Sequence, residues 1–196
     1  MKSIIVPIVV LFLFVAGNLF GQISGGARIG ANISNLKYSE DNFSEKQESK
    51  VGPIIGLYVT YMFAEQAGIQ PELFYSLMGA GDPGDEDKTN LSYIALPVMF
   101  RYNITEQFHL LAGPQFSFLL SAKEKDPDGD VDMKDETSSI DVGFTIGAGA
   151  DINKFNVGLR YLFGLSNVAD FESIGDFKVK NSAFQIVLGY RLFEGF

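Results

Sequence analysis

The chain lacks cysteine and tryptophan altogether, and histidine occurs once, as His109. The absence of cysteine excludes a disulfide framework, a zinc–thiolate site, a cysteine nucleophile and a bacterial lipoprotein anchor. A single histidine excludes a multi-histidine metal site. Basic residues are also scarce, with 15 Lys and Arg against 24 Asp and Glu, which gives a net charge of −9. This balance argues against nucleic acid as a partner, because phosphate groups bind Lys and Arg.

The acidic excess is concentrated in four segments that together account for the entire net charge: 37–50, 81–90, 121–138 and 167–182. The rest of the chain is close to neutral. The sequence therefore predicts hydrated, acidic loops set apart from an almost uncharged framework.

The start of the chain resembles a secretory signal. It has a basic "MK", an apolar run "IIVPIVVLFLFVA" and a small-residue exit "GNLFGQ". A membrane-spanning helix needs about 20 apolar residues, so this run has the length of a signal core; an uncleaved anchor helix is the alternative. We predict a signal peptide at 1–21 and a single domain at 22–196. No later segment is long and apolar enough to span a membrane as a helix, so the mature chain would enter a bilayer as strands.

Alternation with a period of two runs through the mature chain. In "DVGFTIGAGAD" (141–151), small or polar residues occupy every odd position and apolar residues every even position. Such alternation is typical of β-strands. Eight alternating segments are found, each long enough to cross a membrane at a tilt. They are 25–36, 51–63, 67–79, 91–102, 108–120, 139–152, 155–167 and 181–193.

The connections between these segments alternate in length. The turns "AEQ" (64–66), "NITEQ" (103–107) and "NK" (153–154) are short, and the other four are the acidic loops. Short periplasmic turns and long extracellular loops are typical of outer-membrane barrels. We therefore predict an all-β fold, an eight-stranded antiparallel up-and-down transmembrane β-barrel.

The charges inside the segments share parity with the glycines and small polar residues. They form a predicted lumen network, a set of side chains that should pair because an unpaired buried charge costs several kcal/mol. Its members are Arg28, Glu72, Arg101, Asp141, Asp151, Arg160 and Arg191. About one charge per strand is too few for a solvated exterior, so a soluble lipocalin-like barrel, with its apolar face inside, is the less favoured alternative. The network either fills the lumen or, in the second interpretation, gates an ion path.

Aromatic residues of the opposite parity lie beside the short turns, where an interfacial girdle is expected. They are Tyr61, Phe63, Tyr102, Phe108, Phe155 and Tyr190. Four prolines also lie inside predicted strands, at Pro53, Pro71, Pro97 and Pro114. A closed barrel has no free edge, so bulges or frayed pairing are expected near them.

Five motifs, in order along the chain, resemble the PorT-like outer-membrane β-barrel family. They are "GIQPELFYSLMG", "YIALPVMFRY", "LLAGPQFSFLL", "VGLRYLFGLSN" and "LGYRLF". The resemblance implies an eight-stranded barrel in the outer membrane of a Gram-negative bacterium, and an accessory role in protein secretion for the name-giving members. The final Phe196 resembles the aromatic signal read by the barrel-assembly machinery, although Glu194 departs from its apolar alternation.

Two further features raise the possibility of metal binding or catalysis, an acidic motif and the single histidine. "DPDGDVD" places Asp126, Asp128, Asp130 and Asp132 at alternate positions in the longest loop, and closely spaced carboxylates can bind calcium. The EF-hand order is not reproduced, so a solvated acidic loop is favoured. His109 begins a strand beside a periplasmic turn, at the wrong end for a lipase or protease site at the extracellular rim.

The sequence thus predicts an integral outer-membrane barrel with a filled lumen, in contact with membrane lipid, that acts structurally or binds at the cell surface. No enzymatic activity, cofactor or nucleic-acid partner is expected. The alternatives are an accessory barrel of a secretion system, with an extracellular or secretion-system protein as partner, a soluble carrier, a lipid-modifying enzyme and a small pore.

Overall fold

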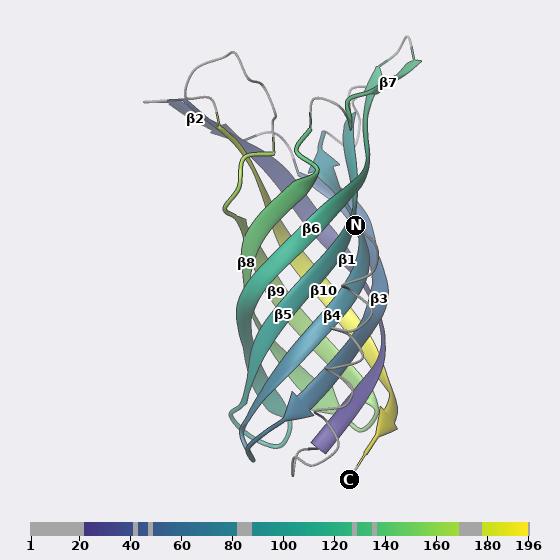
Figure 1. Cartoon of the computed structure of the whole chain (residues 1–196), viewed down its shortest axis with the longest axis vertical. Coiled ribbons are helices and arrows are strands. Elements are labelled where there is room, and N and C mark those ends of the chain that lie inside the picture. The colour runs from purple at the N-terminus through teal and green to yellow at the C-terminus, as the bar shows by residue number, and fades with distance from the viewer. Residues whose placement is uncertain are drawn as a thin grey trace, which may run out of the picture.

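A computed structural model describes residues 22–40, 43–46, 49–81, 88–126, 129–134, 137–168 and 178–195. These residues form strands almost throughout (Figure 1). The strands are β1 (Gln22–Glu40), β2 (Phe43–Lys46), β3 (Lys50–Met62), β4 (Ala67–Ala80), β5 (Lys88–Asn103), β6 (Phe108–Asp126), β7 (Gly129–Asp132), β8 (Ile140–Ile152), β9 (Phe155–Gly164) and β10 (Lys178–Glu194). The predicted signal peptide lies outside the described residues. No helix within the described ranges is long and apolar enough to cross a membrane.

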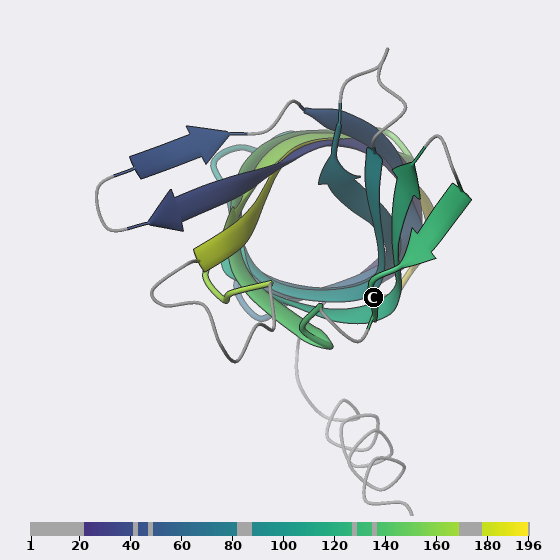
Figure 2. The same ribbon diagram turned by 90° about the horizontal axis from the view of Figure 1, so that it is seen from above.

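Eight of the strands close into an antiparallel barrel in chain order, β1, β3, β4, β5, β6, β8, β9 and β10. Pairing of β10 with β1 completes the ring, from Ser24 opposite Glu194 to Ser39 opposite Lys178. The other two strands, β2 and β7, extend the tops of β1 and β6 as hairpins. Figure 2, seen from above, shows the closed ring with both hairpins flared outside it. The predicted fold class is confirmed.

All eight predicted strands are present, but β1 and β6 are considerably longer than expected. Each runs on into a predicted loop and folds back there through β2 or β7. The sequence of these segments shows no regular alternation of apolar and polar residues, so the period-two pattern does not extend into them.

Side chains alternate between the outside and the inside of the barrel. On β3, for example, Leu57 is 56% exposed, whereas its neighbour Tyr58 is 5% exposed. On β5 the even residues face out, so that Leu96 is exposed and Arg101 is buried. The apolar set therefore covers the outer surface, where a lipid environment makes exposure favourable, and the polar set faces the lumen.

All four prolines coincide with interruptions in the strand pairing, as expected for a closed barrel. Pro71 pairs with β5, but its ladder to β3 is broken; Pro97 pairs with β6, but its ladder to β4 is broken. Pro114 repeats the pattern between β6 and β5. A gap beside a proline is expected, because proline has no backbone N–H to donate to a neighbouring strand. Pro53 pairs with β1, but the ladder from β3 to β4 stops at Ile54 and resumes only at the isolated bridge between Ser49 and Ala80.

The lumen has two different fillings. Toward the long-loop end lies an apolar cluster, the upper core, made of Leu36, Met78, Ala80, Leu91, Tyr93, Leu119, Ala122, Leu162, Val168, Val179 and Ala183. Toward the short turns the lumen is filled with charged and amide side chains. These polar side chains form the candidate site.

Candidate functional site

Glu72 on β4 is the centre of the polar filling. Its carboxylate accepts hydrogen bonds from Arg28 Nη1 at 2.5 Å and from Arg160 Nη1 and Nη2 at 2.6 and 2.8 Å. The amide of Gln70 donates to it as well. The side chains of Arg28, Arg160 and Glu72 are at most 1% exposed. Two guanidinium groups from β1 and β9 thus meet one carboxylate from β4, which ties distant walls of the barrel together through charge-assisted bonds.

Arg28 is also held on its other sides. Its guanidinium carbon lies 4.3 Å from the centre of the Tyr58 ring, and its Nη2 donates to Asn156 at 2.7 Å. A cation over an aromatic face is attracted by the ring quadrupole. Arg28 on β1 is therefore held by side chains of three other strands, β3, β4 and β9.

A second ion pair lies closer to the short turns. Arg101 on β5 pairs with Asp151 on β8, and its Nε donates to Asn103 at 2.9 Å. Asp151 also accepts from Asn156 at 2.8 Å and faces His109 Nδ1 at 3.5 Å. His109, which sequence reasoning left outside the lumen network, is therefore a buried member of this lower cluster, at 1% exposed.

The glycines of β8 explain why these large side chains fit. A Cβ built at Gly147 would lie 2.7 Å from Cγ of Arg160, and one at Gly149 would lie 2.5 Å from Nε2 of His109. Real Cβ atoms do not approach other atoms so closely. The glycine face of "DVGFTIGAGAD" is thus the space that Arg160 and His109 occupy.

Two of the predicted network residues lie apart from the others. Asp141 is 3% exposed and accepts hydrogen bonds from Ser166 at 2.6 Å and Asn181 at 2.9 Å, and within the described part of the chain it forms no ion pair. Arg191 lies at the mouth of the barrel, where it pairs with Glu194 at 3.0 Å and donates to the carbonyl of Asn153 at 2.7 Å. Parity correctly assigns both to the inner side but says nothing about their height in the barrel.

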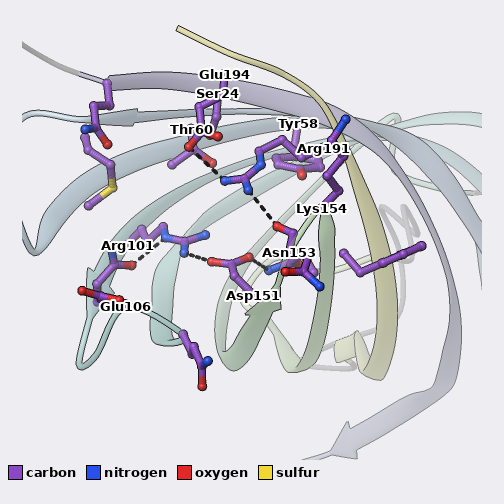
Figure 3. A pocket seen from close by; sticks show the side chains of 16 residues that line it. Ser24, Tyr58, Thr60, Arg101, Glu106, Asp151, Asn153, Lys154, Arg191 and Glu194 are labelled. Carbon is purple, nitrogen blue, oxygen red and sulfur yellow. Dashed lines mark hydrogen bonds and ion pairs between the residues drawn. The ribbon is translucent and has the colours of Figure 1, made fainter. Parts of the chain in front are cut away.

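A cavity of about 370 Å³ opens at this mouth (Figure 3). It is lined by residues at the short-turn ends of β1, β3, β5, β8, β9 and β10 and by the short turns themselves, and most of these residues are polar. Arg101 and Asp151 lie in its wall, and the guanidinium of Arg191 reaches across it toward Asn153 and Glu194, as the dashed lines in Figure 3 show.

The six predicted girdle aromatics lie on the outer surface near the short turns. Phe155 and Tyr190 pack edge to face at 5.3 Å, and the Phe63 ring lies 6.5 Å from that of Tyr61. Phe63, Tyr102, Phe108, Phe155 and Tyr190 are each 41–55% exposed. Their position suits the interface between hydrocarbon and headgroups.

The predicted calcium ligands remain a prediction. Asp128 lies outside the described residues, and of the four only Asp132 has a described side chain, which is exposed and accepts a hydrogen bond from the backbone of Lys134. The described residues contain no group of three or more acidic or histidine side chains that could hold a metal ion.

These features together define an integral outer-membrane β-barrel, with apolar walls, a polar inner face and unequal loops at its two ends. The model of the outer membrane protein beta-barrel domain family matches residues 20–170, and the chain belongs to that family. No curated protein matches it in sequence.

Two solved structures are similar in fold. Ail, the attachment invasion locus protein of Yersinia pestis, is 18% identical, with a TM-score of 0.54 over 88% of this chain and 99% of Ail. Neisserial surface protein A is 13% identical, with a TM-score of 0.53 over 85% of this chain and 97% of the other. Ail has also been solved with the heparin analogue sucrose octasulfate, and that structure has a TM-score of 0.51.

Proposed function

We propose that this outer-membrane barrel works at the cell surface through its long acidic loops, and is neither an open pore nor an enzyme. The observation that carries the proposal is the double filling of the lumen. Glu72 bonded by two arginines blocks the polar half, and the upper core occupies the half above it. A continuous water path would need both fillings to open, so the loops are the part of the chain left to act.

The loop charges favour a basic partner. Loops 81–90 and 121–138 carry the largest part of the acidic excess. Ail was solved with sucrose octasulfate, a polyanion. The acidic loops of this chain would repel such a ligand, and we expect them to attract basic protein surfaces instead, with an association rate that falls as salt rises.

The position of His109 argues against a catalytic role. It lies beside Asp151 in the lumen, Gly149 packs against it, and among the described residues it has no hydrogen bond with a serine. A lipid-modifying enzyme would need its base at the lipid face or the extracellular rim, within hydrogen-bond reach of a nucleophile.

The test places the mature barrel in lipid nanodiscs and measures binding to a panel of basic proteins and to sucrose octasulfate. A matched variant carries Asn in place of Asp82, Asp85, Asp87, Asp126, Asp128, Asp130 and Asp132. We expect the natural chain to bind at least one basic protein in a salt-dependent way, and the variant to lose that binding. Equal binding by both chains, or steady conductance of the natural chain in a planar bilayer, would contradict the proposal.

The motifs that resemble PorT-like barrels support a second proposal, an accessory role in protein secretion. Pro71, Pro97 and Pro114 lie in these motifs, and each interrupts the pairing of neighbouring strands. Purification of the intact barrel from gently solubilised membranes separates the two proposals. Stable co-purification of secretion components supports the accessory role, and a lone barrel supports the first proposal.

A further inference from the structure

The cavity at the short-turn end is lined by groups of both charges. The cations are Arg101, Lys154 and Arg191, and the anions are Glu106, Asp151 and Glu194. This lining has no net charge, so a purely anionic or purely cationic ligand has no electrostatic advantage there.

Apolar side chains contribute little to the cavity. Met62 and Phe155 are the apolar members of the lining, beside the amphipathic ring of Tyr58. Sites for hydrophobic small molecules are lined mainly by apolar and aromatic residues. The cavity therefore does not suit an acyl chain, although its 370 Å³ falls within the range of about 300–1,000 Å³ found for small-molecule sites.

The inner wall of the cavity is rigid. Asp151 accepts hydrogen bonds from Arg101 and Asn156, and these two are held in turn by Asn103 and Arg28, so the side chains are already oriented before any ligand arrives. A preorganised wall lowers the entropic cost of binding.

The outer wall, by contrast, carries polar groups with unused hydrogen-bonding capacity. The cavity is also lined by Gln22, Ser24, Gln107 and Tyr58, whose side-chain amide and hydroxyl groups form no hydrogen bond with another described residue. Tyr58 itself is fixed, because its ring is stacked on Arg28. Amides and hydroxyls both donate and accept, so this surface matches a ligand rich in groups that do the same.

We infer that the cavity binds a short segment of a polyhydroxylated, amide-bearing saccharide chain presented from the periplasmic side. Such a ligand is uncharged and offers donors and acceptors at every ring. The short turns face the periplasm in barrels of this class, so the cavity is open to glycans on that side. This inference does not depend on the loop function proposed above.

The test uses the mature barrel in nanodiscs, titrated with chitotetraose, a neutral N-acetylated saccharide, and followed by methyl or amide NMR shifts. We expect saturable shifts at residues of the cavity. Tyr58→Phe removes the free hydroxyl but keeps the ring on Arg28, and we expect it to weaken binding about three- to tenfold, the effect of one lost hydrogen bond. The matched control Tyr75→Phe removes a hydroxyl from the outer face and should bind as the natural chain does.

A second variant guards against an indirect effect on folding. Gln22→Ala removes an exposed side chain that makes no hydrogen bond in the structure, so its barrel should fold normally. We expect it to weaken binding too. The inference is overturned if chitotetraose causes no saturable shift at millimolar concentration, or if both variants bind it as tightly as the natural chain.

Discussion

The two halves of the lumen follow opposite rules, although the same eight strands enclose both. In the lower half the inner face is polar, around Glu72, and the outer face is apolar, as lipid demands. In the upper half the inner face is apolar, around Met78 and Leu119, and the outer face stays apolar, as at Phe118 and Leu120. The two halves therefore share an apolar outer face and differ in what fills the lumen, which is a charged network below and an apolar core above. The comparison shows that the inward-facing residues of one strand can change from polar to apolar along its length, as those of β6 do between Gln115 and Leu119.

This difference predicts that the two halves respond differently to substitution, and the largest response should come from Glu72→Gln. The change leaves Arg28 and Arg160 buried without a carboxylate, so we expect a loss of about 3–5 kcal/mol in the free energy of unfolding, or failure to fold. Urea unfolding in detergent micelles, with heat-modifiable migration on gels as a check of folding, measures it. The exposed Glu106→Gln is the control. An unchanged urea midpoint for Glu72→Gln would show that the polar filling does not hold the barrel.

The upper half should respond to substitution as a packed apolar core does. Met78 is fully buried in the upper core, so Met78→Ala leaves a cavity and we expect a loss of about 3 kcal/mol. The same urea titration applies. Leu120→Ala on the outer face is the control, because Leu120 is 46% exposed and should lose about 1 kcal/mol or less. If both variants lose equal stability, the upper half is not a packed core.

Asp141 sharpens the comparison, because it is as buried as Glu72 but is bonded by neutral groups. Its partners Ser166 and Asn181 can also bond an amide, so Asp141→Asn leaves no charge uncompensated. We expect a change of about 1 kcal/mol or less. A loss as large as that of Glu72→Gln would reveal a cation bound beside Asp141, and a repeat in the presence of a chelator would identify a divalent one.

The smallest effect is expected at Arg191. Its pair with Glu194 is partly exposed, at 32% and 53%, and exposed ion pairs are weak. Arg191→Ala should change the free energy of unfolding by about 0.5 kcal/mol or less, in the same assay. A change of several kcal/mol would mean that the mouth of the barrel, and not its centre, is the stabilising layer.

Much of the fold could be predicted from the sequence, because alternate residues of a membrane-barrel strand face lipid and lumen and therefore differ in polarity. Parity alone assigned Arg28 and Glu72 to the inside and Leu57 to the outside. Parity has no information on height, however, so it grouped Asp141 and Arg191 with charges that lie elsewhere in the lumen. The hairpins made by β2 and β7 were missed because their sequences show no regular alternation of apolar and polar residues.

His109 shows what further signal was available. It has the parity of Leu111, which also faces in, and it stands opposite Gly149 on β8. A glycine opposite a large polar residue of inward parity indicates that the side chain occupies the space the glycine leaves. Reading pairs of strands together, instead of each alone, would have added His109 to the lower cluster.

The pairing of β1 with β10 has a consequence for the order of folding. The ring closes only through contacts between residues 22–40 and residues 178–194, the most distant parts of the domain. Loop-closure entropy must be overcome before these contacts form, which makes such topologies slow to fold. Until the last strand arrives, β1 presents an unpaired edge to other chains. The barrel is therefore most vulnerable to aggregation just before it is complete, and a chaperone or an assembly factor would have to protect that edge.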